Sequence, residues 1–160
     1  MSEQIFNEIV ICDLDDTLIK HNSNGPNCVR ADESFDFELY AQDFPNRKTI
    51  DEVLNLLNSL PETTYIILLT ARNELIREET EEDLERRGVP YNELTMMPED
   101  LADSMDQSNY KGVQTTFKIS MFNQLELDEI KVKLVIDDLI PFNVHCANQG
   151  ISVLNPNSLI

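Results

Sequence analysis

The sequence of 160 residues predicts an α/β fold of three layers, a Rossmann-like arrangement with a mostly parallel five-stranded sheet. Short apolar runs alternate with segments of helical periodicity, which is the pattern of strands joined by crossover helices. Several of the runs end directly in polar or charged residues, as strands do at the ligand-binding edge of such a sheet. The expected strands cover residues 9–12, 65–69, 93–98, 132–136 and 151–154.

The first expected strand is the stretch around which the chain is organised. Ile9 to Cys12 suit a strand that is buried on both faces, and Asp13, Asp15 and Asp16 follow at once. Because an unpaired buried carboxylate is costly, these acids need a compensating cation, and oxygen ligands select a hard one such as Mg2+. If the extended backbone continues, Asp13 and Asp15 point to the same side of the sheet.

Residues 20–48 follow the acidic stretch and contain no clear helical pattern. An irregular segment of this length inside a compact domain is usually functional or mobile. We interpret it as a flap over the site, with a β-hairpin as one form, and not as a separate domain. Its aromatic residues suit contact with a substrate and plain packing against the core equally well; they are Phe35, Phe37, Tyr40 and Phe44.

Helical spacing and cap residues predict the remaining elements. Thr49 suits the start of a helix that runs to Leu60, and Asn73 suits the cap of a charged helix that Gly88 ends. Residues 99–113 are polar and turn-like, so we expect an irregular connection there. The other expected helices open at Thr115 and at Pro141.

Polar groups also follow the second and fourth strands. A hydroxyl such as Thr70 at a strand end can hold an anion together with backbone N–H groups, and Arg72 adds a fork that suits phosphate. An ion pair with the acidic helix that follows is the alternative for Arg72. The fourth strand ends in Asp137 and Asp138; we expect Asp137 to complete a metal site with Asp13, and Asp138 to orient a metal-bound water or to pair with a lysine.

These residues carry a resemblance. Asp13-Leu14-Asp15-Asp16-Thr17 resembles the DxDxT motif of the haloacid dehalogenase-like (HAD) phosphohydrolases, and Thr70 matches the hydroxyl residue of their second motif. The third motif is a lysine, for which Lys118 is the match and Lys111 the rival. The resemblance covers almost the whole chain. It implies one HAD-like domain over residues 1–160 with a minimal cap, namely the flap at about 20–48.

The closest subfamily resemblance is to the 3′-phosphatase domain of phage polynucleotide kinase–phosphatases. It rests on the TAR ending of the second strand, a GVPY segment before a Met-rich strand, a Phe-Lys helix and VIDDLIPFN. The sequence contains no P-loop GxxxxGK[ST], so we expect no kinase half in it. The resemblance implies hydrolysis of a 3′-phosphate at a polynucleotide end, or of a nucleotide.

The implied chemistry is Mg2+-dependent hydrolysis through an aspartyl-phosphate. Asp13 attacks phosphorus, and Asp15 protonates the leaving oxygen and then activates water. Thr70 and Lys118 hold the phosphoryl oxygens, and Thr17 and Arg72 bind the substrate. The metal ligands implied are Asp13, Asp15 through its backbone carbonyl, Asp137 and Asp138.

Composition limits the partners. The net charge of −18 argues against a long nucleic-acid footprint, although it allows contact with one terminal phosphate. No apolar run approaches the roughly 20 residues of a membrane span, and the N-terminus does not resemble a secretory signal. Three scattered cysteines fit free thiols in a reducing cytoplasm. We expect a phosphorylated substrate and no membrane, and the oligomeric state stays open.

Two other functions fit parts of the pattern. One is a phosphatase of small metabolites such as sugar phosphates or nucleotides. The other is a non-enzymatic phosphoacceptor that resembles a response-regulator receiver, which also uses acids, Mg2+, Thr and Lys. Receivers carry the phosphorylated Asp on a mid-sequence strand, whereas the third strand here ends in Met96-Met97-Pro98. This difference argues against the receiver.

Overall fold

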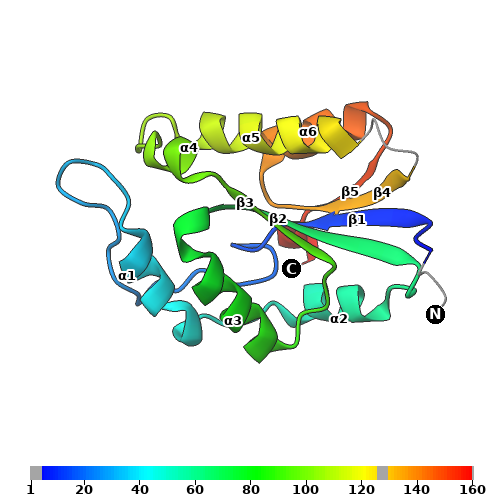
Figure 1. The fold of residues 1–160 in the computed structure, drawn as a ribbon, viewed down its shortest axis with the longest axis horizontal. Helices are drawn as coiled ribbons and strands as arrows, with labels where there is room; N and C mark the ends of the chain where they lie inside the picture. Colours follow the sequence, from blue (N-terminus) through cyan, green and yellow to red (C-terminus); the bar gives the residue numbers. More distant parts are fainter. Residues whose placement is uncertain (1–4, 126–129, 160) are drawn as a thin grey trace.

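The computed structural model describes residues 5–125 and 130–159. Its five strands form one sheet in the order β3-β2-β1-β4-β5, and all neighbouring pairs are parallel (Figure 1). The α/β fold with a five-stranded parallel sheet is therefore confirmed. The strands are β1 (Glu8–Cys12), β2 (Thr64–Asn73), β3 (Glu93–Met97), β4 (Lys131–Ile136) and β5 (Ser152–Leu154).

Helices cover both faces of the sheet. In Figure 1, α2 (Asp51–Ser59) and α3 (Arg77–Arg87) lie below it, and α5 (Tyr110–Leu125) and α6 (Ile140–Asn148) lie above it. The strand order thus runs outward from β1 through β2 to β3, and then resumes on the other side of β1 at β4. The carboxyl ends of β1 and β4 form the switch point where open α/β sheets bind ligands.

The shorter elements include α1 (Phe37–Gln42) and α4 (Glu99–Asp103). Three 3-10 turns accompany them: η1 (Phe44–Asn46), η2 (Glu74–Ile76) and η3 (Pro156–Leu159). Among the residues that the structure describes, no helix is both long enough and apolar enough to cross a membrane.

Burial of the central strands fixes the switch point. Val10 and Cys12 of β1 and Leu68 of β2 are fully buried, as the apolar runs predicted. The ladder continues one residue beyond each strand, because the Asp13 N–H donates to the Ile136 carbonyl at 2.9 Å and Asp137 donates to the next strand. The two acids that end β1 and β4 are therefore held side by side by backbone hydrogen bonds.

The flap (residues 20–48) contains the helix α1, which the sequence did not predict. Asp36 caps it by accepting from the Leu39 N–H at 3.0 Å, and Phe37 and Ala41 are buried. Six residues are too few to display helical periodicity, so the pattern was missed. Of the hairpin, the described residues show one isolated antiparallel bridge, between Val29 and Phe35.

The expected irregular connection at 99–113 is wrong. It contains α4, and α5 begins at Tyr110, five residues before the predicted start at Thr115. The Asp106 carboxylate accepts from the N–H groups of Ser108 and Asn109 at 2.8 and 3.0 Å, which is the capping pattern of a helix start. Asp106 was one of several acids in this stretch, and nothing local distinguished it.

Arg87 of α3 ties the end of the flap to the body of the protein. Its guanidinium donates to the carbonyls of Phe44 and Arg47, each at 2.8 Å, and to Thr49 Oγ1 at 2.9 Å. Its Nε lies 2.9 Å from the Oδ2 of Asp83, which is fully buried. One buried cation therefore satisfies two backbone carbonyls and a buried carboxylate.

Replacing Arg87 by Met should lower the free energy of unfolding by about 3 kcal/mol, because a buried carboxylate loses a partner and two carbonyls lose their donor. Chemical denaturation measures the change. Arg86→Met is the matched control, since Arg86 pairs with the same Asp83 but its side chain is 50% exposed. Equal effects of the two substitutions would contradict the role given to Arg87.

Candidate active site

Three carboxylates and a lysine meet at the switch point. Asp13, Asp137 and Asp138 each contribute an oxygen, and these oxygens lie within 4.8 Å of one another. Lys118 of α5 points into the group, with its Nζ 3.0 Å from Asp13 Oδ1 and 2.6 Å from Asp137 Oδ2. Thr17 Oγ1 lies 3.1 Å from Asp13 Oδ2 and 3.3 Å from Asp138 Oδ1. We call these five residues the acidic cluster.

The acidic cluster contains three carboxylates but only one cation, and burial makes this imbalance costly. Burial and the charge of Asp13 raise the pKa of Asp137 to about 7 and that of Asp138 to about 8. Burial opposes the charge of Lys118, but the nearby carboxylates outweigh it and hold its pKa above the usual range. One lysine thus faces three carboxylates, and these all-oxygen donors suit a hard divalent cation.

The raised pKa values predict how stability depends on pH in the absence of metal. Asp137 and Asp138 hold protons in the folded protein at pH values where the unfolded chain has released them, so their contribution to stability falls as pH rises from about 4 to about 8. Asp138→Asn should remove part of this fall. Melting temperatures of the two proteins between pH 5 and 9, with and without Mg2+, measure it.

The other acids of the chain titrate in both proteins, so the difference in melting temperature between wild type and Asp138→Asn reports the contribution of Asp138 alone. We expect Mg2+ to stabilise the wild type more than the variant at high pH, because bound metal stabilises the folded state that binds it. Parallel pH curves for the two metal-free proteins would contradict the raised pKa of Asp138.

The Asp15 carboxylate has different partners from that of Asp13, which contacts Lys118 and Thr17. The strand ends at Cys12, and the chain then turns, with the Leu18 N–H donating to the Leu14 carbonyl at 2.8 Å. The Asp15 carboxylate faces Arg72, whose Nε and Nη2 lie 3.0 and 2.9 Å from its two oxygens. The Asp15 carboxylate is not part of the three-carboxylate group.

In the Asp15–Arg72 pair the arginine is buried and the carboxylate is partly exposed. The Arg72 side chain is 1% exposed, and that of Asp15 is 30% exposed. Burial acts to raise the pKa of Asp15, but the charge and hydrogen bonds of Arg72 outweigh it and lower the pKa. The alternative considered for Arg72, an ion pair with the helix after it, is not observed among the described residues; there it contacts Thr80 Oγ1 at 3.4 Å.

The structure also places the remaining candidates. The Thr70 hydroxyl accepts from the Arg72 N–H at 3.1 Å, so its own proton is available to an anion. Lys118 reaches the carboxylates, whereas exposed Lys111 has its Nζ 6.0 Å from the ring centre of Tyr110. Lys118 pairs with Asp137, and the described structure shows no pair between Lys118 and Asp138, which was one of the two roles expected for Asp138.

Sequence reasoning missed one residue that supports the acidic cluster. The Asn143 side chain donates to the Asp137 carbonyl at 2.8 Å and is itself buried. The Leu139 N–H holds the Asp137 carboxylate from the other end, at 2.9 Å. The sequence gives little sign of this role, because an asparagine one turn into a helix can equally well be exposed to solvent.

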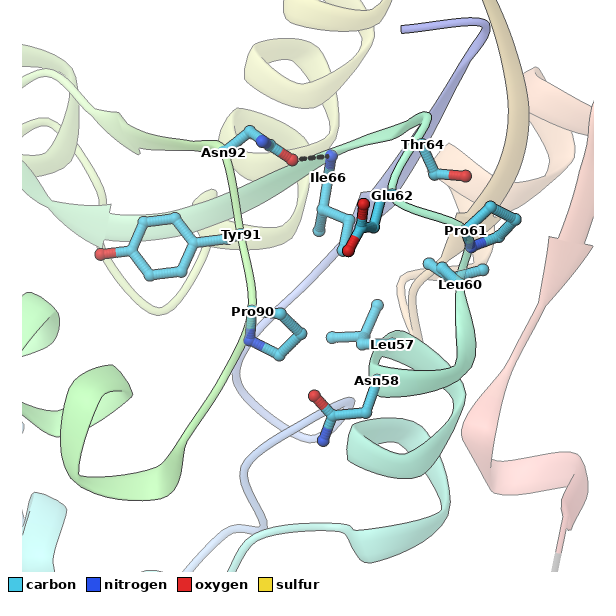
Figure 2. Close-up of a pocket in the computed structure, with 10 residues that line it drawn as sticks. All are labelled: Leu57, Asn58, Leu60, Pro61, Glu62, Thr64, Ile66, Pro90, Tyr91 and Asn92. Atoms are coloured by element: carbon cyan, nitrogen blue, oxygen red, sulfur yellow. Dashed lines mark hydrogen bonds between the residues drawn. The ribbon is translucent and has the colours of Figure 1, made fainter. Parts of the chain in front are cut away.

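A cavity of about 740 Å³ lies away from the acidic cluster, near the start of β2 (Figure 2). Figure 2 shows the Asn92 side chain, from the segment that leads into β3, bonded to the Ile66 N–H, and the end of α2 on the facing side. The cavity therefore lies at the amino edge of the sheet, opposite the switch point. Its lining consists of Leu57, Asn58, Leu60, Pro61, Glu62, Thr64, Ile66, Pro90, Tyr91 and Asn92.

The fold and the acidic cluster together define an α/β protein that gathers three carboxylates and a lysine at its switch point. The model of the HAD superfamily, subfamily IIIB (Acid phosphatase), matches residues 2–138. The chain therefore belongs to this subfamily of the HAD superfamily, and it is a phosphatase. No curated protein sequence matches the chain.

Solved structures share the fold at low sequence identity. A chain of the Pnkp1/Rnl/Hen1 complex aligns with a TM-score of 0.61 and 22% identity, over 96% of this chain and 47% of that one. The HAD domain of the effector protein Lem4 from Legionella pneumophila aligns with a TM-score of 0.52 and 16% identity, over 96% and 88% of the two chains. The present chain thus spans about half the length of the Pnkp1/Rnl/Hen1 chain that it matches.

Proposed function

We propose that the protein is a Mg2+-dependent phosphomonoester hydrolase that acts through an aspartyl-phosphate on Asp13, with a 3′-phosphate at a polynucleotide end or a nucleotide as substrate. One observation carries the proposal: Lys118, Asp13 and Asp137 converge at the switch point of a HAD phosphatase, with Asp138 beside them. A nucleophile beside a buried cation is what phosphoryl transfer requires.

The donor set fits a divalent cation, and Asp13, Asp137, Asp138 and the backbone carbonyl of Asp15 would hold it. When bound, the cation neutralises the charge of two anions that must approach each other. Lys118 adds to this neutralisation. We propose that it and the Thr70 hydroxyl hold phosphoryl oxygens during the transfer.

The reaction proceeds in two halves that balance in atoms and charge. An Asp13 oxygen bonds to phosphorus while the ester bond breaks, and Asp15 passes a proton to the leaving oxygen. Asp15 then takes a proton from water, whose oxygen bonds to phosphorus. The bond between Asp13 and phosphorus breaks and phosphate leaves. Asp15 then releases the proton it took from water to the solvent, so that it is ionised again for the next turnover.

The first proton needs a source, because Arg72 keeps the pKa of Asp15 low. A phosphomonoester itself carries a proton with a pKa near 6. We propose that the substrate enters as its monoanion and that its proton reaches the leaving oxygen through Asp15. Arg72 and Thr17 then serve the substrate indirectly: Arg72 holds Asp15, and Thr17 holds Asp13.

Two features support a 3′-phosphate end or nucleotide as the substrate. The chain shares its fold with a chain of the Pnkp1/Rnl/Hen1 RNA repair complex, which aligns in a second structure with a TM-score of 0.51. The flap is the main insertion over the site, so a polymer end can enter. The net charge of −18 restricts contact to the terminal nucleotide.

Because all three cysteines are free thiols, we also propose that the protein works in the cytoplasm.

The test is release of phosphate, with Mg2+, from a 3′-phosphorylated oligonucleotide beside 3′- and 5′-mononucleotides. Preference for the oligonucleotide supports a 3′-phosphatase of polynucleotide ends, and preference for mononucleotides supports a nucleotidase. Release from sugar phosphates alone would replace the proposed substrate with a small metabolite. A lasting phosphoprotein without turnover would overturn the hydrolase in favour of a phosphoacceptor.

A further inference from the structure

The flap carries an aromatic cluster (Phe35, Phe37, Tyr40 and Phe44) whose function the proposed reaction does not explain. The ring centres of Phe35 and Phe37 are 4.8 Å apart, and those of Tyr40 and Phe44 are 5.3 Å apart, in edge-to-face contacts. Phe35 also meets Tyr40 at 5.3 Å. The aromatic cluster is therefore one packed unit. Two of its members, Tyr40 and Phe44, also lie against Arg72.

The aromatic cluster ends on the Asp15–Arg72 pair. The central carbon of the Arg72 guanidinium lies 3.9 Å from the ring centre of Phe44 and 5.7 Å from that of Tyr40. The Tyr40 side chain also helps to lower the pKa of the Asp15 carboxylate. The two flap residues thus lie against Arg72, the residue that holds the proton-transferring carboxylate of Asp15.

A second arginine, Arg47, also packs on the flap segment that bears these rings. Its guanidinium carbon lies 4.4 Å from the ring centre of Tyr40. Arg47 is paired with buried Asp43 at 3.2 Å, and Asp43 also accepts from the Asn22 and Asn46 side chains. The Tyr40 ring therefore lies beside two guanidinium groups, those of Arg47 and Arg72.

We propose that Tyr40 and Phe44 are positioning residues for Asp15: Phe44 fixes the plane of the Arg72 guanidinium, and the Tyr40 hydroxyl fixes the carboxylate that this guanidinium holds. The inference rests on the proposed function, in which Asp15 transfers the proton. A bidentate pair requires the guanidinium and the carboxylate to lie in one plane, and stacking on a ring restricts that plane. A flap aromatic thereby controls the direction in which Asp15 presents its oxygens.

This role has a signature that a purely structural role lacks. A strongly basic sugar alkoxide needs a proton as it leaves, whereas a nitrophenolate leaves without one. Misplacing Asp15 should therefore slow hydrolysis of a 3′-nucleotide and spare 4-nitrophenyl phosphate. The kcat/KM values report the first half of the reaction, up to formation of the aspartyl-phosphate, where this proton is transferred.

The experiment compares kcat/KM on both substrates for wild type, Tyr40→Phe and Phe44→Leu. General acid catalysis contributes about 10²- to 10⁴-fold, so partial misplacement should lower the ratio of the two kcat/KM values about tenfold in each variant. Tyr91→Phe makes the same change at the amino-edge cavity, and its ratio should equal that of the wild type. Tyr40→Phe keeps the ring, so it is the informative variant if Phe44→Leu does not fold.

The outcomes separate the inference from the proposed function. A lower ratio in Tyr40→Phe, with 4-nitrophenyl phosphate hydrolysed as in the wild type, supports the inference. An unchanged ratio in an active Tyr40→Phe protein, or an equal loss on both substrates, overturns the inference and leaves the proposed function standing. Wild-type protein that hydrolyses neither substrate overturns the proposed function and, with it, the inference.

Discussion

Replacement of Asp13 by Asn is expected to lower kcat by about 10⁴-fold or more, since the variant has no nucleophile to form the aspartyl-phosphate. The fold should persist. Asp13 is one of three carboxylates crowded within 4.8 Å, so losing its charge relieves repulsion, and Lys118 keeps Asp137 as a partner. Steady-state phosphate release measures the loss, and thermal denaturation without metal measures stability.

Two observations would test this expectation further. Asp51→Asn changes an exposed acid in the first turn of α2, so its kcat should stay at the wild-type value. Mass spectrometry of acid-quenched wild-type protein should find added phosphate, which Asp13→Asn should lack. Retained turnover in Asp13→Asn would remove Asp13 from the proposed role of nucleophile.

Replacement of Lys118 by Met should damage both stability and activity. Methionine keeps most of the length of the side chain, but the buried Asp13 and Asp137 lose the cation that touches both. Leaving a buried carboxylate unpaired costs about 3–5 kcal/mol of unfolding free energy, and kcat should fall about 10²- to 10³-fold with the loss of a phosphoryl donor. Denaturation at pH 9, above the raised pKa values of Asp137 and Asp138, measures the first effect.

Lys111→Met is the matched control, because this lysine was the rival candidate in the same helix. Lys111 is exposed and does not contact the acidic cluster in the described structure, so the substitution should change the unfolding free energy by less than about 0.5 kcal/mol. If Lys111→Met lost activity and Lys118→Met kept it, the assignment of the two lysines would have to be exchanged.

The fold could be predicted from the sequence because its central strands are buried on both faces. Ile9 to Cys12 appear as an unbroken apolar run for that reason, and the acids after such a run mark where burial ends. Short helices leave no such pattern in the sequence, so they are harder to predict. The helix α1 depends on one capping aspartate and on packing of its aromatic residues, neither of which produces a periodic pattern.

The candidate site could be predicted as a set of residues but not as a set of contacts. The order of strands brings Asp13 and Asp137 together, and that order follows from alternating elements. The partner of each carboxylate depends on side-chain direction. Asp15 turns toward Arg72 because the strand has ended, and adjacent Asp137 and Asp138 face different ways, so one meets Lys118 and the other meets Thr17.

The ion pairs of Lys118 and Arg72 affect the rate at which a substrate reaches the site. Lys118 and Arg72 are neutralised by carboxylates, so a substrate at a distance experiences the field of a chain with net charge −18. That field repels a phosphate ester. Raising the ionic strength from about 0.01 to 0.15 M shortens the screening length from about 30 to 8 Å. Added salt should therefore accelerate productive collision, the reverse of its effect on a basic nucleic-acid-binding surface.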